Sequence, residues 1–159
     1  MKTAGISDIK QALHNLAPNE LIDLCLRLGK FKKENKELIS FLLFEAHDTD
    51  GYIQSVKRMM EQEFENVHTT NLYFAKKTLR KILRITNKHI KYTASAMVET
   101  ELLLHFCQLY KALAIPTHRS TALQNLYDQQ IKKIRKSNAQ LHEDLQYEYN
   151  KTLNRLQRS

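Results

Sequence analysis

The sequence predicts an all-α protein, and three observations support this prediction. Only three glycines and two prolines interrupt its 159 residues. Both prolines, Pro18 and Pro116, stand where a helix can begin, because proline is tolerated in a first helical turn. No alternating β-branched run bounded by turn residues occurs, so we expect no sheet. We predict about seven or eight antiparallel helices in a layered bundle or an irregular α-solenoid-like array, forming a single domain over residues 1–159.

The first three helices follow from caps, breakers and apolar spacing. The first is expected to start at a cap on Ser7 or Asp8, and the second at Pro18, with Gly29 ending it after Leu28. Spacing at steps of three and four predicts a buried stripe along the second helix, comprising Leu21, Leu24, Cys25 and Leu28. The third covers about Glu34 to Ala46. Its run Leu38 to Phe44 is apolar around nearly the whole circumference, so we expect it to be the hub of the N-terminal half.

The next two helices are amphipathic. The turn at Asp48 to Gly51 precedes the fourth, whose inward residues are expected to be Ile53, Val56, Met60 and Phe64. The fifth covers about Leu72 to Tyr92. One apolar arc runs along it, made of Leu72, Ala75, Leu79, Ile82, Leu83, Thr86 and Ile90.

The sixth helix, about Ser95 to Leu113, is the most hydrophobic and should pack directly on the fifth. Glu99, on the apolar side of its first turn, is expected to pair with Arg84. No Gly or Pro separates Arg119 to Lys136 from Asn138 to Arg158. These two ranges therefore form either two helices or one long helix.

Positive charge is concentrated on the fifth helix. Seven of the eight net positive charges come from Asn66 to Val98, which contains no acidic residue. All seven cations lie outside the apolar arc, and with Tyr73 as a stacking group the candidate binding residues are Tyr73, Lys76, Lys77, Arg80, Lys81, Arg84, Lys88 and Lys91. Like charges at steps of four repel one another, so these cations either pair with acids or bind phosphates. The acids available on the fourth helix are Glu61, Glu63 and Glu65, and a second basic group, Lys132, Lys133, Arg135 and Lys136, is interpreted as an ordinary polar face.

Motifs for catalysis or metal binding fail on inspection. A calcium loop built on Asp48 to Gly51 would put Lys57 where the bidentate glutamate belongs. Glu101 and His105 share one helical face, but one such pair is more typical of a hydrogen bond between helices than of a site. Glycine-rich phosphate loops, nucleophile elbows and paired-cysteine zinc spacings are missing. We therefore predict that the protein is not an enzyme and needs no metal or cofactor.

The remaining features indicate compartment and class of function. Cys25 and Cys107 lie within apolar helical patterns, which is typical of free thiols in a reducing cytoplasm. The N-terminus lacks an apolar signal core, and no apolar run is long enough for a membrane span. We expect a cytoplasmic, non-catalytic helical module that interacts with or scaffolds an unidentified protein partner. The alternative is nucleic-acid or polyanion binding through the basic face of Leu72 to Tyr92.

Overall fold

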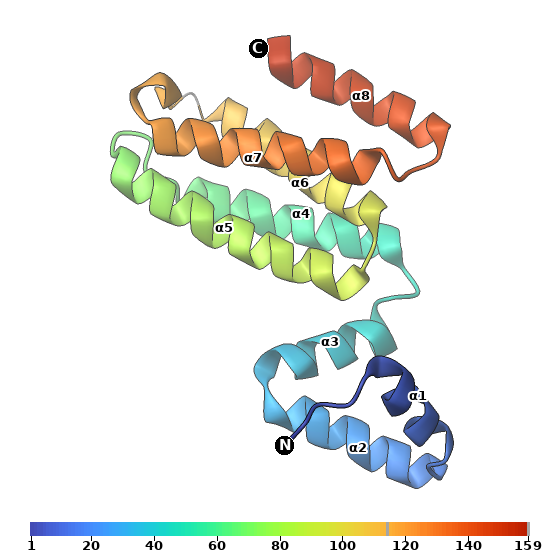
Figure 1. The fold of residues 1–159 in the computed structure, drawn as a ribbon. Helices are drawn as coiled ribbons and strands as arrows, with labels where there is room; N and C mark the ends of the chain where they lie inside the picture. The colour runs from blue at the N-terminus through green and yellow to red at the C-terminus, as the bar shows by residue number, and fades with distance from the viewer. Residues whose placement is uncertain (114, 159) are drawn as a thin grey trace. The chain divides into compact units, whose positions relative to one another are not determined.

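The computed structural model describes residues 1–113 and 115–158, and this described part is all-α. It contains eight α-helices, one 3-10 turn and no strand, which confirms the predicted fold class (Figure 1). The elements are α1 Ile6–His14, α2 Pro18–Phe31, α3 Lys33–Phe44, α4 Thr49–Glu65, α5 Leu72–Thr93, α6 Ala96–Ala112, η1 Thr117–Arg119, α7 Thr121–Asn138 and α8 Glu143–Arg158.

The chain divides into two compact units, Met1–Glu45 and Ala46–Ser159. We refer to them as the N-terminal unit and the C-terminal unit and describe each by itself. The first holds α1 to α3, and the second holds α4 to α8. A single domain over residues 1–159 stays a prediction.

In the N-terminal unit, α2 and α3 pack against each other as a helical hairpin. Two predicted boundaries were wrong. The first helix begins at Ile6 with Gly5 as its N-cap, so Ser7 and Asp8 lie inside its first turn. Gly29 does not end α2, which continues to Phe31. A Cβ atom at Gly29 would lie 3.1 Å from Ile39 Cδ1, so this glycine lets α3 approach α2 closely.

The predicted hub and buried stripe of this unit were also wrong. In α3 only Phe41 is buried, whereas Leu42, Leu43 and Phe44 are 58%, 67% and 69% exposed. The α2 helix buries no residue, and Cys25 is exposed. Apolar spacing indicates which face of a helix is apolar, but burial also requires another element to cover that face.

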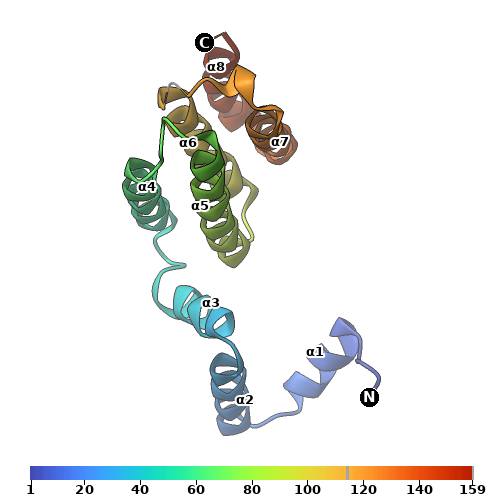
Figure 2. The same cartoon turned by 90° about the vertical axis from the view of Figure 1, so that its left-hand side faces the viewer.

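In the C-terminal unit, α6 is the central helix. It packs against α4, α5, α7 and α8, which confirms the predicted contact with α5. Its buried residues cover a broad arc of the helix and are Val98, Thr100, Leu102, Leu103, Leu104, Phe106, Cys107 and Tyr110. Both views show α4 and α5 on one side of α6 and α7 and α8 on the other (Figures 1 and 2). Burial also raises the pKa of the Cys107 thiol to about 12, so this cysteine behaves as a small apolar side chain.

Side-chain caps set several helix starts in this unit. Asp48 Oδ1 accepts a hydrogen bond of 2.9 Å from the Gly51 amide, so Asp48 to Gly51 is a capped helix start. The side chain of Asn71 accepts from the amides of the first turn of α5, and Ser95 and Ser120 cap α6 and α7 in the same way. The four inward residues predicted for α4 are all buried.

The region after Arg119 forms two helices, which settles the alternative left open by the sequence. The α7 helix ends at Asn138, and α8 begins at Glu143. Asn138 is buried, and its Nδ2 atom donates to Asn150 Oδ1 at 3.0 Å across the turn. Gln146 Nε2 donates to the Leu141 carbonyl at 2.7 Å. Polar side chains therefore hold this turn, without a Gly or Pro.

The central position of α6 predicts a large difference between two phenylalanines of the C-terminal unit. Phe106→Ala should lower the free energy of unfolding by about 3–5 kcal/mol, because it leaves a cavity at a fully buried position of α6. Phe74→Ala, at a half-exposed position of α5, should cost less than about 1 kcal/mol. Urea denaturation of both variants measures the difference. Similar losses would show that α6 is not the core.

The end of α5 predicts a stabilising substitution. Ala94 adopts a left-handed conformation with φ of 49°, which costs a residue with a Cβ atom about 1 kcal/mol. Ala94→Gly should therefore raise the free energy of unfolding by about that amount. The matched control is Ala139→Gly, since Ala139 ends α7 with φ of −61°. A gain in the control equal to that at Ala94 would contradict the explanation.

Candidate polyanion-binding surface

The α5 helix presents its cations outward because its other side is buried. The predicted apolar arc is confirmed at Ala75, Leu79, Ile82, Leu83, Thr86 and Ile90, all of which are buried, while Leu72 is half-buried. Of the seven cations, Lys76 and Lys88 are half-buried and the rest are exposed. The packing of α5 on α4 and α6 therefore fixes the direction in which these charges point.

The acids of α4 neutralise little of this charge. Glu63 Oε2 lies 2.8 Å from Lys81 Nζ. Glu61 contacts His105 instead, and the expected pair between Glu99 and Arg84 does not form within the described residues. Over the same residues, no ion pair reaches the five cations Lys76, Lys77, Arg80, Arg84 and Lys91. Most of the repulsion along α5 thus has no internal counter-charge.

A groove of about 530 Å³ runs between α5 and α7. Its floor includes Leu83 and Leu126, and its polar walls are formed by Arg80, Arg84 and Asn87 from α5 and Asn125, Gln129 and Lys133 from α7. No carboxylate lines it. The groove therefore places three cations from two helices around one space, which favours an anion there.

Lys133 was missed as a site residue by the sequence analysis, which treated its basic group as an ordinary polar face. The signal in the sequence is its spacing, because Asn125, Gln129 and Lys133 follow one another at steps of four and so share one face of α7.

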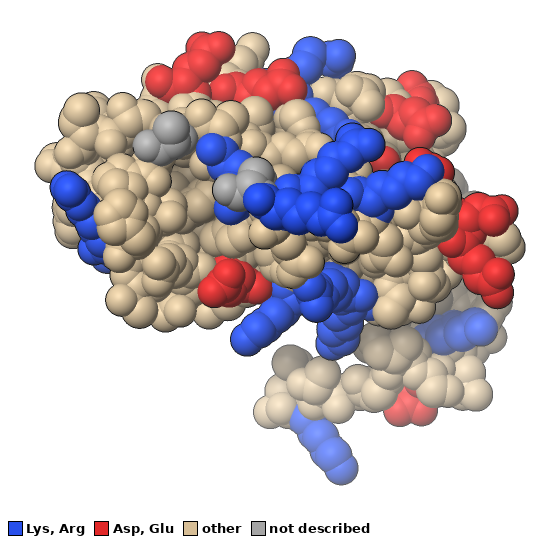
Figure 3. Space-filling model, turned by 90° about the horizontal axis from the view of Figure 1, so that it is seen from above, with Lys and Arg blue, Asp and Glu red and all other residues tan. Residues whose placement is uncertain are grey.

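Seen from the α7 and α8 side, Lys and Arg side chains gather across the middle of the surface, and Asp and Glu lie toward its margins (Figure 3).

The predicted stacking residue lies on the same face of α5 as the groove cations. Tyr73 is 65% exposed, and its ring meets that of Phe74 edge to face with 5.4 Å between centroids. Steps of four and three along α5 connect one stripe of side chains, Tyr73, Lys77, Arg80, Arg84, Asn87 and Lys91. At 1.5 Å per residue this stripe is about 27 Å long. It begins with an aromatic ring and passes along the wall of the groove.

The amides in the groove have unused hydrogen-bonding groups. Within the described residues, the side chains of Asn87, Asn125 and Gln129 make no hydrogen bond with the protein. Each carries one acceptor and two donors. A ligand in the groove can therefore meet neutral donors and acceptors as well as positive charge.

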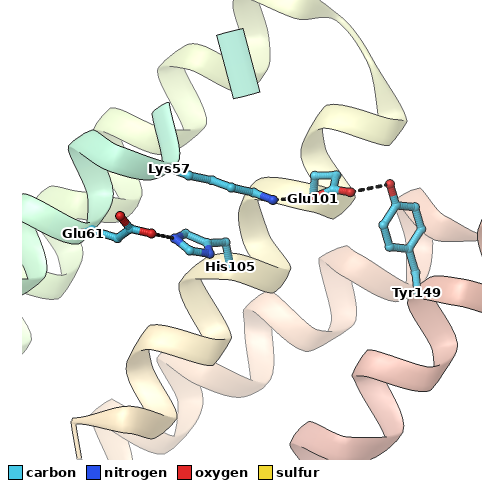
Figure 4. A network of polar contacts seen from close by, with 5 residues as sticks. All are labelled: Lys57, Glu61, Glu101, His105 and Tyr149. Atoms are coloured by element: carbon cyan, nitrogen blue, oxygen red, sulfur yellow. Dashed lines mark hydrogen bonds and ion pairs between the residues drawn. The ribbon is translucent and has the colours of Figure 1, made fainter. Parts of the chain in front are cut away.

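Glu101 and His105 form separate contacts between helices and do not bond each other (Figure 4). Glu101 accepts from Lys57 Nζ on α4 at 2.6 Å and from the Tyr149 hydroxyl on α8 at 2.9 Å. His105 Nε2 lies 3.0 Å from Glu61 Oε1 without the alignment of a hydrogen bond, and the two form an ion pair only when the His105 ring is protonated. These contacts connect α6 with α4 on one side and with α8 on the other, as expected for a structural network.

The described residues contain no cluster of three or more His, Cys, Asp or Glu side chains suited to a metal ion. None of the described helices combines the length and apolarity that spanning a bilayer requires. No family model matches the chain, and no match was found among curated proteins or solved structures.

The network predicts how stability changes with pH. Burial and the charge of Lys57 lower the pKa of His105 below its ordinary value of 6.5, although Glu61 and Glu101 act in the opposite direction. As the pH falls below 6.5, the unfolded chain takes up a proton before the folded chain does, so the free energy of unfolding should fall.

This fall should be smaller in His105→Gln, which removes the titrating ring. Urea denaturation of the parent protein and the variant between pH 7.5 and 5 measures it. The other histidines contribute equally to both proteins, so the difference between the two profiles isolates His105. Parallel profiles would contradict the assigned direction of the pKa shift.

Proposed function

We propose that this chain is a non-catalytic binding module whose C-terminal unit holds a single strand of nucleic acid along α5 and in the groove between α5 and α7. One observation supports this above the others. Arg80 and Arg84 face the same groove as Lys133; among the described residues none of the three has an ion pair, and no carboxylate lines the groove. The phosphate backbone of a nucleic-acid strand is the polymeric anion that such an arrangement suits best.

The neutral groups around these cations favour nucleic acid over a simple polyanion. Amide side chains can hydrogen-bond base edges or ribose hydroxyls, and the groove holds three amides without protein partners. Tyr73 offers an exposed ring at the start of the stripe, where a base can stack. A polymer that alternates phosphates with flat, hydrogen-bonding bases would use all three kinds of group.

The carboxylate and imidazole that could have served in catalysis have other partners. Glu101 is engaged by Lys57 and Tyr149, and His105 lies against Glu61. These contacts support the non-catalytic part of the proposal, because an acid or base must be free to reach a substrate.

The protein-interaction function remains a second proposal, and a separate observation favours it. The N-terminal unit exposes an apolar groove that does not resemble a phosphate site. Such a groove suits an apolar partner, and binding there would be separate from the binding of nucleic acid.

Removal of the groove cations should weaken binding. Arg80→Gln, Arg84→Gln and Lys133→Gln combined should reduce affinity for oligouridylate by at least about 10-fold at low salt, because charges that contact phosphates are lost. The slope of log affinity against log salt should decrease by about two, at roughly 0.7 per phosphate contact on a single strand. Fluorescence anisotropy at several salt concentrations measures both.

The matched control removes three cations elsewhere, with Lys10→Gln, Arg58→Gln and Arg119→Gln. These side chains are exposed, lie outside α5 and α7, and lower the net charge by the same amount. The control should keep both affinity and slope close to those of the parent protein. Equal losses of affinity in the two triple variants would show that net charge alone explains the effect. If the parent protein bound neither RNA nor DNA, the proposal would be wrong.

A further inference from the structure

The N-terminal unit has an open apolar groove between α2 and α3. Its volume is about 810 Å³, and its apolar lining includes Leu21, Ile22, Cys25, Leu26, Ile39 and Leu43. Ile22 and Leu26 are 56% and 55% exposed. The groove lies between two helices that pack on each other, so it is a concave surface with walls from both.

This unit lacks the helices needed to cover its own apolar surface. Neither α1 nor α2 contains a buried residue, and α3 contains only Phe41. Apolar surface that remains concentrated in one groove is typical of a site for another molecule.

A basic rim borders one end of the apolar lining, where α2 joins α3. Four exposed lysines line the groove, Lys30, Lys32, Lys33 and Lys36, and no acidic residue does. Of these, Lys33 lies 3.8 Å from Glu37 Oε1 at the surface. The groove is therefore complementary to a molecule with an apolar stripe and with acidic side chains that flank this stripe near the α2–α3 connection.

We propose that this groove binds an amphipathic helix of a partner protein, with apolar side chains at steps of three and four and with Glu or Asp on its flanks. Such a helix would lay its apolar stripe between α2 and α3 and direct its acids to the lysine rim. The α2 wall is 14 residues long, so a helix of about 14 residues, roughly 21 Å, would match it.

Other occupants fit these features less well. A second copy docked through the same groove would join two linings that both carry lysines and no acidic residue, so neither rim would meet an opposite charge. A phosphate chain could pair with the lysines but would leave the six apolar side chains of the lining uncovered. A bilayer surface receives a convex apolar face, whereas this groove is hollow.

The test uses the full chain and three labelled helical peptides of about 14 residues, the length of α2. The first has leucines at steps of three and four with glutamates on its flanks, the second replaces those glutamates with lysines, and the third replaces the leucines with serines. Fluorescence polarisation should show binding of the first peptide and at least about 10-fold weaker binding of the other two.

Two variants tie this binding to the groove. Leu26→Asp should abolish it, because a charge would enter the apolar lining. Lys30→Glu, Lys32→Glu and Lys36→Glu combined should reverse the preference, so that the lysine-flanked peptide binds better than the glutamate-flanked one. The gain of a new partner cannot arise from misfolding. Lys132→Glu, Arg135→Glu and Lys136→Glu on α7 form the matched control and should leave the preference unchanged.

Several results would overturn the proposal. They are no peptide binding by the parent protein, equal binding of all three peptides, or an unchanged preference in the rim variant. Two further measurements examine the other occupants. A dimer in solution that Leu26→Asp dissociates would assign the groove to a second copy. Association with vesicles containing phosphatidylserine, lost in the same variant, would assign it to a membrane surface.

Discussion

The burial of α6 is the constraint on which the C-terminal unit depends. This helix buries eight side chains over a broad arc, and four other helices pack against it. Because α5 and α7 both rest on α6, their polar faces border one groove. Arg80 and Lys133 lie 53 positions apart in the sequence. They line the same groove because α5 and α7 both pack on α6.

The same burial explains how α5 tolerates its charge. Lys76, Arg80, Arg84 and Lys88 form three like-charge pairs at steps of four, each worth about 0.2–0.5 kcal/mol against the helix. On the opposite side, a single fully buried Leu or Ile stabilises the fold by about 1.5–3 kcal/mol, and α5 buries four such side chains. Burial is the larger effect, so the fold tolerates the repulsion between these cations. The fold tolerates the cations of α5 but does not require them for stability. The proposed binding of nucleic acid would give them a function.

The sequence was sufficient where apolar spacing and burial coincide. The inward residues of α4 and the arc of α5 follow from periodicity because α6 covers both. It was not sufficient for α2 and α3, whose spacing is equally regular but whose apolar faces remain open, as Leu43 shows. Periodicity cannot indicate whether a covering element exists. The contribution of Lys133 could not be derived either, because it depends on which faces of α5 and α7 border each other.

The central claim is that the groove between α5 and α7 receives a nucleic-acid strand, and side-chain NMR tests it most directly. The side-chain amides of Asn87, Asn125 and Gln129 line this groove and give NMR signals of their own. We predict that addition of oligouridylate shifts all three sets of signals together with those of Arg80 and Arg84, and that the shifts saturate. Unchanged amide signals, or shifts confined to residues outside α5 and α7, would contradict the account.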